Sequence, residues 1–300
     1  MRSVALCLLA ATLSAGCSVR KFAINKLGDS LATSGATYAA DDDPDLVGQA
    51  LPFGLKLVEG LLAESPEHRG LLLAAASGFT QYAYAYVNQD ADMIEPENLE
   101  KATALRGRAR RLYLRARDYG LRGLDTRHKA FSRDVKRDPK AAAQVATKAD
   151  VPMLYWTAAA WTLAITLSRD NPDLIADQPI AEALIDRAME LDPDYDSGAI
   201  HGFLISYEPA RQGARGDPAA RARTHFDRQV ALTKGQLAAP FVSLAEAVSI
   251  QSQNRADFES LLKRALAINP DDRPEWRLQN LIAQRRARWL LDRVDDLFAR

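Results

Sequence analysis

The stretch AEALIDRAMELDP, residues 181–193, shows the pattern that decides the fold of this chain. Its apolar residues recur every three or four positions, which places them on one face of a helix: Leu184, Ile185, Ala188 and Leu191. Asp192-Pro193 follows, and an Asp or Asn before a proline is typical of a helix start, because the side chain caps free amides and proline needs no amide partner there. The stretch predicts an amphipathic helix that ends at a cap for the next one.

The rest of the chain repeats this punctuation. Five further pairs join an Asp or Asn to a proline: Asp43-Pro44, Asp138-Pro139, Asn171-Pro172, Asp217-Pro218 and Asn269-Pro270. Apolar spacing between the pairs is helical, and no segment alternates convincingly as a strand. The tyrosine-rich run at 82–86 has a period of two, but it continues an alanine-rich stretch that favours helix. We therefore predict one long helix there, with Phe79, Tyr82 and Tyr86 on one face.

The opening stretch also has the small, bulky, small and proline positions of the second helix in a tetratricopeptide (TPR) repeat: Ala181, Ile185, Ala188 and Pro193. A second set matches three of these positions: Phe258, Leu262, Ala265 and Pro270. The spacing between sets is irregular. We therefore expect an all-α fold of irregular TPR-like helix-turn-helix repeats that form a compact α-solenoid or bundle. Residues 274–298 are expected to form a C-terminal capping helix with a polar outer face.

The N-terminus has the features of a lipoprotein leader. Arg2 precedes an uncharged apolar run over residues 4–13, the length of a signal-peptide core. Small residues lead to Cys17, the arrangement that signal peptidase II lipidates and cleaves. The only other cysteine, Cys7, lies inside the leader, so no disulfide is expected. We predict a signal peptide at 1–16, a lipid-anchored segment and linker at 17–43, and a helical domain at 44–300; no later segment has the about 20 apolar residues of a membrane span.

Charge is balanced overall but uneven locally. The chain has 39 Lys and Arg against 39 Asp and Glu, so bulk electrostatics select no partner. Residues 29–100 are strongly acidic and residues 101–137 strongly basic, and we expect these two regions to pair. The basic stretch could also contact an acidic protein or anionic lipid headgroups. Export excludes nucleic acid as its partner.

Signals for catalysis and metal binding are weak. His68, His128, His201 and His225 are scattered without the spacing of a metal site, and no phosphate-binding loop or nucleophile elbow is present. Carboxylate clusters at 41–43 and 295–296 read as solvated charge. We predict no enzyme, no metal and no cofactor. An envelope hydrolase remains an alternative for which no residue can be nominated.

Aromatic residues are the best candidates for a binding site. One set lies in the tyrosine-rich helix and another in the run YWTAAAW, residues 155–161. Aromatic side chains commonly line apolar ligand sites, although helical bundles also bury them as core. The candidate lining of an apolar ligand site or pore is Phe79, Tyr82, Tyr86, Trp156 and Trp161.

Several phrases together resemble a known family. They are Gly16-Cys17-Ser18, DPDLV at 43–47, ALPF at 50–53, AASGFTQYAY at 75–84, RARRLYLRARDY at 108–119, YWTAAAW at 155–161, SLAE at 243–246 and RPEWR at 273–277. They span nearly the whole chain, which is similar to the T component of TRAP (tripartite ATP-independent periplasmic) transporters. The resemblance implies a periplasmic lipoprotein of TPR-like helices, anchored at Cys17, beside the substrate-binding P component and a hydrophobic ligand.

We therefore expect a lipid-anchored, non-enzymatic accessory protein that forms a homo-oligomer and binds the P component. Ser18 follows the cysteine where an Asp would retain many lipoproteins in the inner membrane, which favours the periplasmic face of the outer membrane. A TPR scaffold lipoprotein for outer-membrane or envelope assembly is the alternative.

Overall fold

The computed structural model describes residues 26, 28–29 and 35–298. Cys17, the leader and most of the anchored segment lie outside these residues. The described part of the chain is helical and contains no strand, which confirms the all-α prediction. The TPR-like repeat geometry stays a prediction, but the small and bulky residues that suggested it are buried between helices, as pairing requires.

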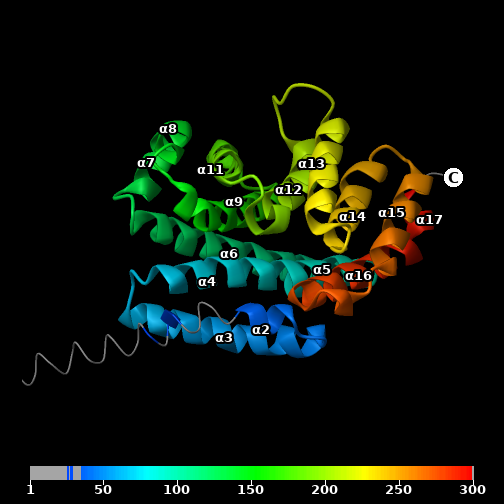
Figure 1. The fold of residues 1–300 in the computed structure, drawn as a ribbon, viewed down its shortest axis with the longest axis horizontal. Coiled ribbons are helices and arrows are strands. Elements are labelled where there is room, and N and C mark those ends of the chain that lie inside the picture. Colours follow the sequence, from blue (N-terminus) through cyan, green and yellow to red (C-terminus); the bar gives the residue numbers. More distant parts are fainter. Residues whose placement is uncertain (1–25, 27, 30–34, 299–300) are drawn as a thin grey trace, which may run out of the picture.

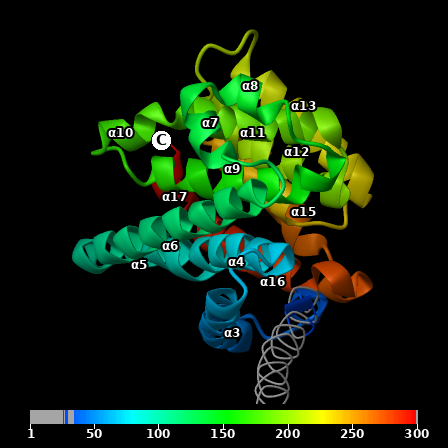
Figure 2. The same ribbon diagram turned by 90° about the vertical axis from the view of Figure 1, so that its left-hand side faces the viewer.

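The first half of the chain stacks its helices in layers (Figure 1). Helix α3 covers one side of α4 and α6, while α9 and α11 lie on the other side, and Figure 2 shows the same order after a quarter turn. In chain order the elements are α2 (Gly35–Ala39), α3 (Pro44–Glu64), α4 (Arg69–Tyr82), the π-helical turn η1 (Ala83–Asn88), α5 (Gln89–Ile94), α6 (Leu99–Asp125), α7 (Phe131–Arg137), α8 (Pro139–Ala143), the 3-10 turn η2 (Lys148–Asp150), α9 (Val151–Thr166), α10 (Pro172–Ala176) and α11 (Gln178–Leu191).

The second half of the chain packs beside the first half, and its last long helix contacts the first helices of the fold. Its elements are α12 (Tyr195–Tyr207), η3 (Glu208–Ala210), α13 (Pro218–Thr233), α14 (Ala239–Leu244), the π-helical turn η4 (Ala245–Ser249), α15 (Arg255–Ala267), η5 (Pro270–Asp272), η6 (Pro274–Trp276), α16 (Arg277–Asp292) and α17 (Val294–Leu297). Helix α16 contacts α2 and α3, so the C-terminal region lies against the start of the fold. The predicted capping helix is thus divided: η6 precedes α16, and Arg293 separates α16 from α17.

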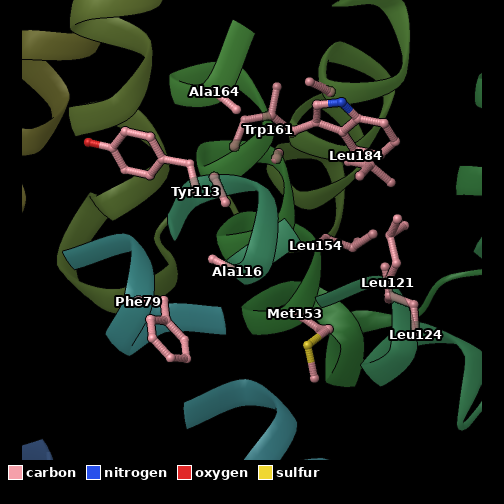
Figure 3. Packing of buried hydrophobic residues seen from close by; sticks show 14 of the residues in the cluster. Phe79, Tyr113, Ala116, Leu121, Leu124, Met153, Leu154, Trp161, Ala164 and Leu184 are labelled. Atoms are coloured by element: carbon pink, nitrogen blue, oxygen red, sulfur yellow. The ribbon is translucent and has the colours of Figure 1, made fainter. Parts of the chain in front are cut away.

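Two hydrophobic cores hold these halves. The larger lies between α3, α4, α6, α9 and α11, and Figure 3 shows part of it, with Tyr113 on α6, Trp161 on α9 and Phe79 on α4. The smaller lies between α13, α14, α15 and α16. Helix α12 joins them, because Ile200 belongs to the first core and Ile205 to the second.

Helices α6 and α9 pack closely because one of them carries glycine at the contact. A Cβ atom built on Gly120 would lie 2.1 Å from Thr157 Oγ1 and 3.3 Å from the Thr157 Cα. Both residues are buried. A side chain at position 120 would therefore push α6 and α9 apart.

Most of the Asp-Pro and Asn-Pro pairs start helices as predicted. Asp43, Asp138, Asn171 and Asp217 accept backbone amides at the first turns of α3, α8, α10 and α13. Asn269 caps the 3-10 turn η5. Asp192 is the exception: its carbonyl closes a turn with the amide of Tyr195, and α12 begins only there.

The end of the predicted linker is packed on the folded body. Residues 35–39 form α2, and α2 contacts α16. Arg277 donates a hydrogen bond from Nη1 to the carbonyl of Ala40 at 2.9 Å. The Asp41 carboxylate accepts a hydrogen bond from the amide of Asp43, and the Asp43 carboxylate accepts hydrogen bonds from the first amides of α3. These two carboxylates therefore fix the start of the helical domain.

Helix α3 carries large apolar side chains on its solvent-exposed side. Its inner face packs Val47, Leu55, Val58 and Leu62 toward the core. By length and composition it is the one described helix that could cross a membrane, a property we did not expect from the sequence. Only 22% of its most apolar 18-residue stretch is buried. The exposed side carries Leu46, Phe53 and Leu57, of which Phe53 is 77% exposed.

The predicted pairing of acidic and basic regions is confirmed in part. Arg106 on α6 binds Asp92 at 2.9 Å and Glu95 at 2.7 Å. Arg115 reaches Glu59 on α3 at 3.4 Å. Several other arginines of α6 instead lie over aromatic rings, as Arg117 does over Trp161. Many charges of the basic stretch are thus used inside the fold.

Candidate functional site

A cavity of about 1070 Å³ lies where the two halves meet. Its walls come from α3, α4 and η1, from α9 and α12, and from α14, η6 and α16. Small-molecule sites usually measure about 300–1,000 Å³, so this hollow has the size of a ligand site. It is the principal candidate site among the described residues.

Aromatic side chains form one wall of this cavity. Tyr84 and Tyr86 come from η1, and Tyr155 and Trp156 come from α9. Tyr84 has 42% of its surface accessible, yet burial raises its pKa above the usual 10. Its accessible surface therefore faces a hollow inside the protein. Burial likewise raises the pKa of Tyr86 to about 12.

Tyr84 and Tyr86 lie in a π-helical turn. The amide of Gln89 donates to the carbonyl of Tyr84, five residues back, where an α-helix would join residues four apart. The extra residue changes the direction of the side chains that follow. Such turns occur often at functional sites, and the second one, η4, carries Glu246, which binds a cavity-lining arginine.

The five aromatic candidates from the sequence divide into two groups. Tyr86 and Trp156 line the cavity. Phe79, Tyr82 and Trp161 do not line it and belong to the larger core. They were grouped with the first pair because all five are aromatic residues in the same two segments of the sequence. Cys17, the predicted lipidation site, lies outside the described residues.

The three core aromatics are held by specific contacts. Phe79 stacks on Tyr119 with ring centroids 6.1 Å apart. The hydroxyl of Tyr82 accepts a hydrogen bond from Arg108 at 3.0 Å. Trp161 is fully buried and donates from Nε1 to Asp177 at 3.2 Å. Each therefore serves packing between helices.

Charged residues in the cavity wall are few. Arg286 donates to Glu246 through Nη2 at 2.6 Å and through Nε at 3.1 Å, and its Nη2 also lies 3.2 Å from Asp92. Arg273 donates to Glu275 at 2.7 Å. The fourth charged lining residue is Asp196, near the start of α12. Sequence reasoning missed Asp196, since nothing in its neighbourhood distinguishes it from a surface aspartate.

The histidines do not form a metal centre. No group of three or more His, Cys, Asp or Glu side chains in the described ranges is arranged to hold an ion. His128 instead contacts the buried Asp150 at 3.0 Å. His201 and His225 face each other with their Nδ1 atoms 2.8 Å apart, which joins α12 to α13. Burial lowers the pKa of His201 to about 4, and neighbouring His225 adds to the effect.

The helices and the cavity-lining residues lie almost entirely within a stretch that matches one known family. A model of the TRAP transporter T-component family matches residues 40–298, nearly the whole chain. The chain belongs to the TRAP transporter T-component family. An uncharacterized protein of Treponema pallidum (strain Nichols) is 33% identical over 304 residues, covering 95% of this chain and 94% of that protein.

Membership in the T-component family confirms the resemblance seen in the sequence. It gives the chain an accessory role in a TRAP transporter system and a membrane-associated or periplasm-facing location. T-components are transporter accessory proteins and not a known enzyme family.

Proposed function

We propose that this T-component is a lipid-anchored periplasmic protein that binds the substrate-binding P component of its transporter and takes a hydrophobic ligand into the cavity. The cavity carries the proposal. It is about 1070 Å³ in volume and lined mainly by aromatic and aliphatic side chains, with hydroxyl and amide groups among them and few charges. Apolar walls with a small number of polar groups are what small-molecule sites have in common.

The anchor in this proposal is Cys17, with the protein on the periplasmic face of the outer membrane. Cys17→Ala should move the protein from the membrane to the soluble periplasmic fraction, because one lipidated residue would be its only firm attachment. Its far-UV circular dichroism should stay helical, since the anchor lies before the helical domain. A Cys17→Ala protein that remains in the membrane fraction would contradict the anchor.

Binding to the P component is tested with the two purified proteins. The cognate P component should be retained by the immobilised T-component, and isothermal titration should give a saturable signal. The matched control is a P component from an unrelated TRAP transporter, which should not be retained. Absence of binding in both assays would remove the P component as partner.

The outer side of α3 suggests where copies of this chain meet. Leu46, Phe53 and Leu57 lie on one face of the helix and are exposed. Exposed apolar patches on soluble domains commonly mark interfaces, and an aromatic residue at the centre is a typical anchor. In light scattering after gel filtration, Phe53→Asp should shift the oligomer toward the monomer. Val145→Asp, which changes an exposed apolar residue elsewhere, should leave the mass unchanged.

A further inference from the structure

The cavity has one uncompensated charge. Of the four charged side chains in its wall, Arg273 is paired with Glu275, and Arg286 is held by Glu246 and Asp92. Asp196 has neither an ion pair nor a hydrogen bond to any described side chain. Asp196 keeps accessible surface and lines the cavity, and partial desolvation there raises the pKa of its carboxyl group. A carboxylate in this position gains free energy from any cation brought beside it.

The backbone at Asp196 is strained in a way that presents this carboxylate to the cavity. Asp196, Ser197 and Gly198 have φ of 46°, 56° and 85°, three consecutive left-handed residues inside α12. Left-handed non-glycine residues are costly and persist where the surrounding structure imposes them, often at binding sites. Asp196 and Ser197 both line the cavity. A right-handed turn here would direct the carboxyl group elsewhere.

Aromatic rings line the cavity together with the carboxylate. The rings of Tyr155 and Trp156 lie 4.9 Å apart, edge to face, and both residues line the cavity. Asp196 lines the same cavity as these two residues and directly follows Tyr195 in the chain. Burial, and then the charge of Asp196, raise the pKa of Tyr155 and of Tyr195. The Tyr195 ring lies 5.6 Å from Tyr155. A carboxylate and several aromatic rings in the wall of one cavity are the groups that bind organic ammonium, through ion pairing and cation–π attraction.

An anionic ligand fits this site poorly. Arg286 is the strongest candidate to bind an anion, but Glu246 and Asp92 already neutralise its charge through Nε and Nη2, and its remaining nitrogen, Nη1, is buried. Arg273 is neutralised by Glu275. A metal ion is also a poor fit, because Ca²⁺ needs six to eight oxygen ligands and no described cluster provides them.

We propose that the cavity binds an amphipathic molecule with a single ammonium head group. The head group forms an ion pair with Asp196 and packs against the rings of Tyr155 and Trp156, and the apolar tail of the molecule fills the rest of the cavity. This inference rests on the ligand-binding part of the proposed function. It adds the charge of the ligand, which neither the apolar lining nor family membership determines.

Three decyl compounds that differ only in the head group test the charge. Decyltrimethylammonium, decanoate and decanol are titrated below their micelle concentrations into the full chain carrying Cys17→Ala, and isothermal calorimetry gives the dissociation constants. Decyltrimethylammonium should bind about tenfold or more tightly than either of the others, the size expected for an ion pair with cation–π contacts in a partly desolvated site.

Asp196→Asn separates the charge from the shape. Asparagine tolerates the left-handed conformation as aspartate does, so decanol should bind Asp196→Asn as it binds the parent chain. Decyltrimethylammonium should lose its advantage over decanol. Asp173→Asn, which removes an exposed carboxylate outside the cavity, should change neither. A second variant, Tyr155→Leu, keeps apolar bulk and should weaken the ammonium compound more than decanol.

The outcomes distinguish the two levels of the proposal. Decanol binding with no preference for ammonium, or equal ammonium binding by parent and Asp196→Asn, would overturn the head-group inference and leave the apolar ligand site in place. Tightest binding of decanoate would also overturn it. Failure of all three compounds to bind would overturn both, because the cavity would then not accept a decyl chain.

Discussion

Acidification should destabilise this protein through the buried histidine pair between α12 and α13. The Nδ1 atoms of His201 and His225 are 2.8 Å apart, and His201 Nε2 is buried without a hydrogen-bond partner. A second proton on His201 would therefore have no acceptor. Burial, His225 and Arg228 together lower the pKa of His201 from 6.5 to about 4, while Asp194 opposes them. Burial also lowers the pKa of His225, where Glu208 opposes and Arg211 and Arg221 assist.

The sign follows from proton linkage. Between pH 6.5 and about 4, His201 is protonated in the unfolded chain but stays neutral in the folded chain. The free energy of unfolding therefore falls as the pH falls. The full difference in pKa corresponds to about 3.4 kcal/mol. About 2 kcal/mol of this is lost between pH 7.5 and pH 5. His225 acts in the same direction.

His201→Asn removes this titration while keeping a polar side chain beside His225. Urea unfolding followed by circular dichroism at 222 nm gives the free energy of unfolding of parent and variant at both pH values. The parent should lose about 2 kcal/mol more than the variant between pH 7.5 and pH 5. The comparison uses the change with pH, so a constant cost of the substitution cancels. Equal losses in the two proteins would refute the argument that the folded state holds a neutral histidine pair.

Two further predictions concern packing. Gly120→Ala should destabilise the fold by about 1–3 kcal/mol, because the new Cβ would lie 2.1 Å from Thr157 Oγ1. The control is Gly107→Ala on the same helix, where the nearest atom to the new Cβ is Arg111 Nη1 at 3.7 Å. This control should be neutral or stabilising in the same urea assay. Trp161→Ala should cost about 3–5 kcal/mol as a core truncation, whereas Trp156→Ala should cost less stability but weaken decanol binding. Equal stability losses in the two tryptophan variants would contradict their assignment to core and cavity.

Much of the helical architecture could be predicted because its signals are local. Helical spacing and caps at Asp43, Asp138, Asn171 and Asp217 depend on residues a few positions apart. The pair at 192–193 looked identical but forms a turn, since three left-handed residues delay the regular part of α12. That conformation is imposed by packing and has no signature in an Asp-Ser-Gly sequence that could distinguish it from an ordinary loop.

The candidate site was harder to predict than the helices. Tyrosine and tryptophan in two helices pointed to the right segments, and Tyr86 and Trp156 do line the cavity. Phe79 and Tyr82 belong instead to the core, where the Tyr82 ring stacks on that of Tyr86 with centroids 5.9 Å apart. Asp196 could not be found at all, because its lack of a partner is a fact about what surrounds it in space.

The sequence by itself determined that the chain is all-helical, where most helices begin, and, through its recurring phrases, to which transporter family it belongs. These properties follow from side-chain spacing and from short-range backbone chemistry. Only the tertiary structure decided which aromatics line a hollow and which fill a core, and which of four wall charges is left uncompensated. Those distinctions depend on the meeting of α9, α12 and α16, which are far apart in the chain and adjacent at the cavity.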